Sequence, residues 1–441
     1  MGSSHVTIVG GGLAGAEAAW QLACRDVDVT LVEMKPNEFS PAHQDPGLAE
    51  LVCSNSFGAT GLETAAGLLQ WEAATLGSLV VREARRAAVP AGRALAVDRS
   101  LFSRAVTRLL EDHPRIAIVR ERVDAVPADR PVLICTGPLT AGGLARDIQA
   151  RVGEQSLYFY DAIAPIILGD SIDRAVVFQA SRYDNGTGDY LNCPLDRETY
   201  EAFVEALLEA DRVSPRPFEE EKLFQACQPI EALASRGRDT LAFGPMRPVG
   251  LVDPRTGERP HAVVQLRRED REGTLWNLVG FQTRLTHGAQ KRVFRMIPGL
   301  HDAVFVRLGS VHRNTFLNAP RVLTERLALK QNPGIYVGGQ LTGVEGYLES
   351  TVTGLMAALF IHADLTGRPL PRPPADTMTG ALLRYLQEAD PKTFQPMNAT
   401  FGLLPSPGRT PRKRRRQIKA TRARGRFLEW AAHLEAQGGT P

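Results

Sequence analysis

The 441-residue chain lacks the long apolar runs and the cysteine framework of membrane and disulfide-stapled proteins. It has no run of about 18 apolar residues, so we expect no membrane span and no membrane partner. Its first residues lack the basic and apolar segments of a signal peptide, so we expect none. The five cysteines are odd in number, scattered and without a CxxC pair, which excludes a disulfide framework and a zinc site. We expect no metal, and a reducing cytoplasm in which thiols stay free.

The chain also lacks a strong net charge, but its charges are unevenly distributed. There are 52 basic and 49 acidic residues, for a net charge of +3. Ten of the basic residues lie between Arg409 and Arg426 without an acid, which leaves 42 basic against 49 acidic residues, or −7, elsewhere. An acidic body with a basic tail indicates a polyanionic partner. The densest part of the tail suits phosphate contact, the alternative being a solvated, frayed end; it comprises Arg412, Lys413, Arg414, Arg415 and Arg416.

Residues 5–33 have the pattern of a strand–turn–helix–strand unit that binds a dinucleotide. The strand His5–Val9 leads into a GxGxxG turn, a helix over 14–25 and a strand over 27–33. In this motif the glycines permit a tight turn, approach of a pyrophosphate and close packing of the helix. Glu33 is placed to accept from a ribose 2′-OH and disfavours NADP, which leaves FAD or NAD, or a turn that binds nothing. The predicted contacts are Gly10, Gly12, Leu13, Ala14, Gly15 and Glu33.

A second glycine-rich segment favours FAD. Residues 334–347 read as a strand and a glycine-rich turn, and a helix is expected over 350–362. A long cofactor needs a second helix N-terminus for its flavin end, and the strand over 132–137 ends at a similar small-residue turn. The alternative is an ordinary βα turn. The predicted flavin contacts are Gly339, Gln340, Gly343, Gly346 and Tyr347.

The middle of the chain differs from both ends. Residues 182–307 are irregular, rich in arginine and proline, and have shorter apolar runs. We therefore predict an α/β fold in which a discontinuous Rossmann-like FAD-binding domain carries a smaller inserted α+β domain. The predicted ranges are 1–181 and 310–441 for the FAD-binding domain and 182–309 for the insertion. Apolar residues at helical spacing over 427–434 predict a C-terminal helix docked on the body, with the basic residues on its approach.

Two of the five cysteines lie in segments suited to chemistry. Cys53 lies in a polar, turn-forming stretch, and Pro229 disfavours a helix running on through Cys227. Each thiol has two interpretations: a reactive group near the flavin, or the small buried residue that a free cysteine usually is. Cys24, Cys135 and Cys193 are interpreted as structural, the first two in the core.

Taken in order, these segments resemble one family. The resemblance rests on residues 10–15, 53–56, 90–92, 94–99, 227–236, 296–300, 312–315, 339–347 and 394–405. The chain is similar to the bacterial folate- and FAD-dependent tRNA (uracil-5-)-methyltransferases, which make ribothymidine in the T-loop of tRNA. The resemblance spans nearly the whole chain. The Cys53, Cys227 and 394–405 segments are more specific than the flavin motifs.

The resemblance implies methylation of C5 of the uridine at position 54. The carbon would come from 5,10-methylenetetrahydrofolate and the electrons from reduced FAD, which NADH or NADPH would reduce again. Uracil C5 is a poor nucleophile, so a thiolate must add to C6, and a base must later remove the C5 proton. We assign Cys227 as nucleophile and Cys53 as proton-handling partner, with the opposite assignment open.

The resemblance also implies sites for folate and RNA. A histidine ring, His287 or His312, is expected to stack on the pterin. Arg284, Lys291 and Arg292 are expected to contact RNA phosphates or the folate glutamate, or to form a solvated face. The partners would be the tRNA T-arm, tetrahydrofolate and a nicotinamide cofactor, and no protein partner is predicted. The target uridine would have to flip out of the T-loop.

Three alternatives to this function stay open on the sequence. The first is a sister flavoprotein that modifies the tRNA wobble uridine, although those chains are longer and end in a helical domain. The second is an FAD/NADH oxidoreductase without an RNA substrate. The third is a flavin-bound RNA-binding module without catalysis.

Overall fold

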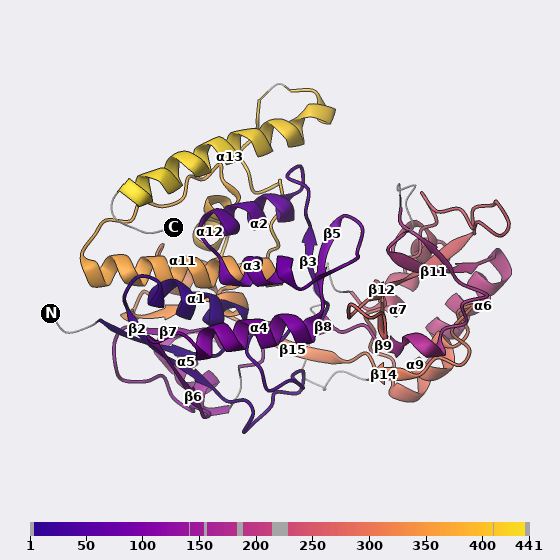
Figure 1. Ribbon diagram of the computed structural model, residues 1–441, viewed down its shortest axis with the longest axis horizontal. Helices are drawn as coiled ribbons and strands as arrows, with labels where there is room; N and C mark the ends of the chain where they lie inside the picture. The colour runs from indigo at the N-terminus through magenta and orange to yellow at the C-terminus, as the bar shows by residue number, and fades with distance from the viewer. Residues whose placement is uncertain are drawn as a thin grey trace.

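The computed structural model describes residues 4–140, 142–153, 157–182, 188–213, 228–408 and 410–436. These residues form two bodies, each built on its own six-stranded sheet (Figure 1). The larger body contains both ends of the chain, and the smaller one contains the middle. The predicted α/β fold with a discontinuous Rossmann-like part and a smaller insertion is therefore confirmed.

The sheet of the first body is a parallel sheet with one antiparallel edge strand. Its order is β16 (Ala328–Leu329), β17 (Asn332–Val337), β7 (Val132–Ile134), β1 (His5–Val9), β2 (Asp28–Glu33) and β6 (Ile116–Arg120). Strands β17, β7, β1, β2 and β6 run parallel, and β16 pairs antiparallel with β17. Strands from the two ends of the chain thus share one sheet and direct their carboxyl ends to the same edge, where Rossmann-like folds bind ligands.

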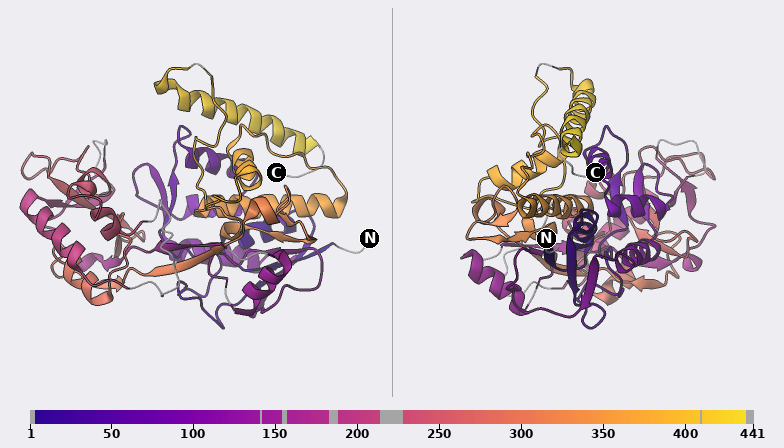
Figure 2. Two further views of the ribbon diagram at one scale, coloured as in Figure 1. Left: turned by 180° about the vertical axis from the view of Figure 1, so that it is seen from behind. Right: turned by 60° about the vertical axis from the view of Figure 1, so that its left-hand side comes forward.

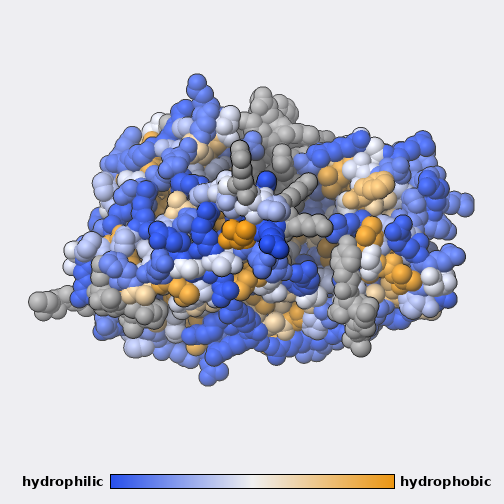
Figure 3. Space-filling model, turned by 90° about the horizontal axis from the view of Figure 1, so that it is seen from above, coloured by the Kyte–Doolittle hydropathy of each residue, from blue (hydrophilic) through white to orange (hydrophobic). Residues whose placement is uncertain are grey.

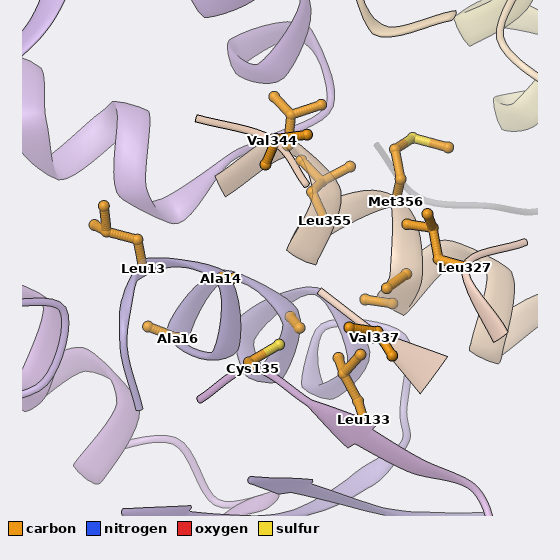
Figure 4. Packing of buried hydrophobic residues seen from close by; sticks show 14 of the residues in the cluster. Leu13, Ala14, Ala16, Leu133, Cys135, Leu327, Val337, Val344, Leu355 and Met356 are labelled. Carbon is orange, nitrogen blue, oxygen red and sulfur yellow. The ribbon is translucent and has the colours of Figure 1, made fainter. Parts of the chain in front are cut away.

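Helices and a small sheet surround this parallel sheet. The helices are α1 (Leu13–Ala23), α2 (Ala65–Thr75), α3 (Leu79–Arg86), α4 (Arg99–Glu111), α5 (Gly142–Val152), α10 (Ala319–Val322), α11 (Tyr347–Thr366) and α12 (Met378–Glu388). The small sheet contains β3 (Ser56–Ala59), β4 (Ala88–Val89) and β5 (Ala94–Val97). Helices α1 and α11 cross at small residues, since a Cβ at Gly354 would lie 2.3 Å from the Ala14 carbonyl oxygen. Figure 4 shows Ala14, Cys135 and Val337 in the core around this crossing.

The second body is an antiparallel sheet packed on helices. Its sheet order is β10 (Phe178–Ala180), β11 (Tyr190–Leu195), β12 (Ala262–Arg268), β13 (Leu275–Leu278), β9 (Ile166–Leu168) and β14 (Phe305–Arg307), and a 3₁₀ turn follows β9 at Gly169–Ser171. Its helices are α6 (Arg197–Glu209), α7 (Ile230–Ala234), α8 (Thr240–Phe243) and α9 (His287–Phe294). Strand β9 precedes residue 182, so this sheet also uses chain from before the predicted range 182–309, and the domain boundaries stay a prediction.

Two antiparallel strands, β8 (Leu157–Ala162) and β15 (Val311–Phe316), connect the bodies (Figure 1). They pair as a two-stranded ribbon where the chain leaves the first body and returns to it. The first body resumes at β15, close to the predicted residue 310.

The last helix, α13 (Arg412–Ala436), contains the basic residues from Arg412 to Arg426 and docks on the first body. Ala423, Phe427 and Trp430 are buried at helical spacing against the first body. The Phe427 and Trp71 rings lie 5.9 Å apart, and the Trp430 indole donates to the Pro371 carbonyl at 2.9 Å. Figures 1 and 2 show the N-terminal end of α13 projecting from the body. The basic residues are thus helical and begin the helix.

The free cysteines outside the predicted site divide into two kinds. Cys135 and Cys193 are buried, and burial raises the pKa of both thiols above the usual range. Cys24 is exposed, so its expected core position was wrong: α1 ends at Ala23, and Cys24 caps the helix outside the packed face. In the part of the chain that the structure describes, no helix has the length and apolar character to cross a membrane.

Candidate dinucleotide and thiol site

The first glycine turn has the geometry of a phosphate cradle. Gly10 has a φ of +103°, and a Cβ there would lie 2.5 Å from the Cys135 carbonyl oxygen. A Cβ at Gly15 would lie 1.9 Å from the Gly10 carbonyl oxygen, so only glycine allows the helix to approach the turn. At Gly12, by contrast, a Cβ meets no atom within 4 Å. Gly12 caps α1 without a side-chain bond, so its side of the turn leaves the first N–H groups of the helix available to a ligand.

Glu33 lies beside this turn at the carboxyl end of β2. Its side chain is 7% exposed. One carboxylate oxygen accepts from the Gly11 N–H at 2.7 Å, and the other accepts from the Lys35 N–H at 3.0 Å. The carboxylate is therefore fixed next to the cradle, at the place that a ribose-binding acid occupies in Rossmann-like folds.

The second glycine segment lies at the same edge of the sheet. The turn Gly339–Thr342 follows β17, and Gly343 and Gly346 have φ values of +91° and +114°. Gly346 caps α11 without a side-chain bond. A Cβ at Gly339 would lie 3.0 Å from the Ala14 side chain, so the two turns meet. The Gln340 amide donates to the Glu345 carboxylate.

Residues 394–405 hold this second turn in place. The Glu345 N–H donates to the Met397 carbonyl at 3.0 Å, and the Asn398 amide donates to the Glu345 carbonyl at 2.7 Å. The buried Glu349 carboxylate accepts from the Ala399 N–H at 2.7 Å, and burial raises its pKa to about 7. Residues 394–405, one of the more specific segments of the family resemblance, thus support the turn that is predicted to contact the flavin.

Hydrogen bonds with two side chains hold the backbone of Cys53 in place. The Tyr347 hydroxyl accepts from the N–H groups of Cys53 at 2.7 Å and of Ser54 at 3.0 Å. Burial raises the pKa of Tyr347, with the Cys53 charge as a further cause. The Arg99 guanidinium donates to the carbonyls of Leu51 at 2.6 Å and Cys53 at 3.3 Å. The half-buried thiol itself is not part of these bonds. Tyr347, predicted to contact the flavin, therefore also links that segment to Cys53.

Three arginines interact electrostatically with this thiol. Arg99 forms an ion pair with the buried Glu269 of the second body, at 2.5 Å and 3.2 Å. Arg99, Arg267 and Arg307 each interact electrostatically with Cys53. Burial lowers the pKa of Arg267 and Arg307. Sequence reasoning gave none of these arginines a role, although residues 94–99 carried part of the resemblance.

Cys227 lies outside the described residues, but both flanks of its segment are anchored. The Val213 N–H donates to the Arg284 carbonyl at 2.8 Å. On the other side, the buried Glu231 carboxylate accepts from the Thr283 hydroxyl at 2.9 Å and the Arg284 N–H at 2.7 Å. The fold thus brings both flanks of the Cys227 segment to Arg284.

The remaining predicted residues lie in separate places. His287, Lys291 and Arg292 are exposed on α9 of the second body, and His312 lies on β15, where its backbone pairs with Asp161. Helix α13 lies on the first body, and Figure 1 shows it far from α9. The structure therefore does not join the two groups of predicted RNA contacts in one patch.

Comparison with known proteins first shows the broad class of proteins to which the chain belongs. The family model described as "Glucose inhibited division protein A" matches residues 5–369. The solved structure of Aquifex aeolicus GidA aligns with a TM-score of 0.67 at 15% identity, over 99% of this chain and 75% of that chain. At this identity the likeness shows the fold alone. The chain is thus of the GidA class, with the FAD-binding type of α/β fold.

More similar relatives define the family within this class. A protein of Pelobacter propionicus is 55% identical over 96% of this chain and 94% of its own length. One from Geobacter sulfurreducens is 54% identical over 97% and 99%. Both are named methylenetetrahydrofolate--tRNA-(uracil-5-)-methyltransferase TrmFO. The chain belongs to this family, which confirms the resemblance found in the sequence.

Proposed function

We propose that this protein methylates C5 of the uridine at position 54 in the T-loop of tRNA, with 5,10-methylenetetrahydrofolate as carbon donor. The observation that carries the proposal is the 54–55% identity, over nearly the full length, to relatives named for this activity. Those names favour it over the wobble-uridine enzyme and over an oxidoreductase without RNA. The clamped thiol beside the glycine turns supports the same chemistry.

FAD fits the two glycine turns. Gly10, Gly12, Leu13, Ala14 and Gly15 would hold its pyrophosphate, since the turn is open at Gly12 and presents N–H groups. Glu33 would bind the ribose. When bound, FAD supplies the electrons that convert the transferred methylene to a methyl group, and NADH or NADPH would reduce it again. The flavin end would lie against Gly339, Gln340, Gly343, Gly346 and Tyr347.

The two thiols would carry the covalent chemistry. A thiolate adds to uracil C6, which makes C5 nucleophilic, and a second group removes the C5 proton. We assign the addition to Cys227 and the proton transfer to Cys53, whose backbone is held by Tyr347 and Arg99. A Cys227→Ala variant should lose methylation and the covalent complex with 5-fluorouridine-containing tRNA. Full activity of this variant would disprove the assignment, and the matched Cys193→Ala variant serves as control.

Folate and RNA would bind on both bodies. His287 or His312 would stack on the pterin, and the exposed Lys291 and Arg292 with Arg284 would meet RNA phosphates or the folate glutamate. A tRNA-modifying enzyme that uses folate, with free thiols, fits a cytoplasmic location.

The basic end of α13 would bind tRNA phosphates. Arg414, Arg415 and Arg416 are exposed, and Figure 3 shows a mainly hydrophilic surface on the side that carries this helix. Arg412 and Lys413 precede them in the same helix. Each lost phosphate contact lowers the slope of log affinity against log salt by about 0.7–0.9. Replacing the three arginines by glutamine should therefore reduce this slope by up to about 2–3. The control replaces three exposed arginines elsewhere, Arg104, Arg108 and Arg197.

One experiment tests the whole function. The protein is mixed with tRNA that lacks the modification, methylenetetrahydrofolate labelled in its methylene group, FAD, and NADH or NADPH. Label should appear in ribothymidine at position 54. Label absent from the tRNA, with a folded and FAD-loaded protein, would overturn the proposal, and label at the wobble position would favour the sister activity.

A further inference from the structure

The sheet of the second body has one apolar and one polar face. Its strand register places Tyr190, Arg267 and Asn277 directly opposite one another on β11, β12 and β13. Directly opposed residues of antiparallel strands point to the same face. The adjacent row contains Leu191, Leu266 and Leu278, which are buried in the core with the helices. Arg267 and Asn277 therefore lie on the polar face.

This polar face lies against the Cys53 segment of the first body. The Asn55 amide donates to the Arg268 carbonyl at 2.8 Å, and the Tyr190 hydroxyl donates to the Ala91 carbonyl at 2.9 Å. The Arg99–Glu269 ion pair crosses the same boundary. Figure 1 shows β12 on the side of the second body that faces the first. The bodies are thus fixed to each other around Cys53.

Arg267 and Asn277 each have a buried nitrogen that could donate a hydrogen bond but has no acceptor in the described part of the chain. Arg267 is 8% exposed and Asn277 is 3% exposed. Within the described part of the chain, neither the Arg267 Nε nor the Asn277 Nδ2 has a hydrogen-bond partner. The nearby carboxylate of Glu269 is already engaged by Arg99. Buried donors normally have acceptors, and a buried donor without one costs free energy. Two such donors on opposed residues indicate an acceptor supplied by a ligand.

We propose that Arg267 and Asn277 bind the carbonyl edge of the target uracil and stabilise negative charge on its O4 when the thiolate adds to C6. This inference rests on the proposed function. In that step the sulfur electron pair forms the S–C6 bond, and the C5=C6 pair moves toward C4, so that charge spreads over C5 and O4. No oxidation occurs. Loss of the C5 proton and cleavage of the S–C6 bond later restore the double bond.

The ligand chemistry follows from the two side chains. Arg267 interacts electrostatically with Cys53, the group assigned to remove the C5 proton, so negative charge on a uracil bound beside Cys53 would lie within the field of Arg267. An asparagine amide offers a donor for O4 and an acceptor for N3–H, the pair of groups that the uracil edge presents. A guanidinium directed at a developing oxyanion is the type of preorganised donor that gives about 10²–10³ in kcat.

The test separates addition to C6 from methyl transfer. Exchange of the C5 hydrogen of the target uridine, measured as tritium release from tRNA labelled at C5 with the FAD-loaded protein, reports addition without folate. Arg267→Gln is expected to lower this exchange and the kcat for methylation about 100-fold, with KM for tRNA within about threefold. The matched control is Arg268→Gln, because the Arg268 side chain points to the opposite face, 5.5 Å from the Trp276 ring centroid. It should exchange at the wild-type rate.

Each outcome has a defined meaning. A folded Arg267→Gln variant, with wild-type flavin content and melting, that exchanges at the wild-type rate overturns the proposal. If Arg267→Gln does not fold, Asn277→Ala decides: a loss of tenfold or more supports the proposal, and wild-type exchange refutes it. If the wild type itself neither exchanges nor methylates, the proposed function fails, and the uracil subsite fails with it.

Discussion

Replacing Gly12 by alanine should weaken FAD binding while leaving the fold intact. A Cβ at this position meets no heavy atom within 4 Å, and the backbone angles of φ −72° and ψ −169° suit any residue. As the N-cap of α1, the position should cost about 1 kcal/mol of stability or less. The added methyl would occupy the space proposed for the pyrophosphate. We expect at least a tenfold loss of FAD affinity, or about 1.4 kcal/mol.

Two further glycines calibrate this prediction. A Cβ at Gly15 would lie 1.9 Å from the Gly10 carbonyl oxygen, so Gly15→Ala must force the helix and the turn apart. It should cost several kcal/mol of stability and abolish FAD binding. Gly288 lies in the first turn of α9 and, like Gly12, has open space around a Cβ. Gly288→Ala should change neither stability nor FAD affinity much.

The assay measures affinity and stability separately. Protein stripped of FAD is titrated with FAD by quenching of flavin fluorescence, and thermal unfolding of the same apoproteins is followed by circular dichroism. The reasoning fails if Gly12→Ala binds FAD as tightly as the wild type. It also fails if Gly12→Ala and Gly288→Ala lose equal affinity, because the effect would then not be local to the turn.

Three other perturbations have defined outcomes. Burial raises the pKa of Glu72 to about 7 from 4.5, so the folded state holds a proton that the unfolded state loses; this contribution is complete below pH 4.5 and disappears as the pH rises through 7. Glu72→Gln should remove about 3 kcal/mol of that pH dependence in urea titrations at several pH values, and an unchanged profile would contradict the assignment. Tyr347→Phe removes the acceptor of the Cys53 N–H and should lower the free energy of unfolding by about 1–3 kcal/mol and reduce methylation. If neither the stability nor the methylation rate changes, Tyr347 does not hold Cys53 in the way described. Trp430→Ala removes the anchor of α13 and should cost about 3–5 kcal/mol by calorimetry and weaken tRNA binding, whereas unaltered melting would show that the helix does not depend on it.

The local part of the candidate site could be predicted from the sequence because it depends on short-range rules. The GxGxxG turn, the adjacent strands and Glu33 lie within 30 residues of one another, and each glycine has a backbone reason that tertiary context does not alter. The docked face of α13 was similarly visible as a helical stripe. Its start was not, because basic residues tolerate both helix and solvated coil, and the helix in fact begins at Arg412.

The environment of Cys53 could not be predicted in this way. Tyr347 is separated from Cys53 by 294 positions in the chain, and Glu269 from Arg99 by 170. No periodicity connects such positions, since the order of strands in a sheet decides which of them meet. Arg267 and Asn277 likewise appear as ordinary polar residues of strands until the register places them on one buried face.

By itself, the sequence determined the dinucleotide turn, the class of the fold and the family, because these depend on residue types at short or fixed spacings. Only the tertiary structure decided how the second body closes against the first, which groups hold Cys53, and which buried donors lack an acceptor. The physical reason is that burial and pairing depend on distances between segments, and those distances exist only once the two sheets are packed against each other.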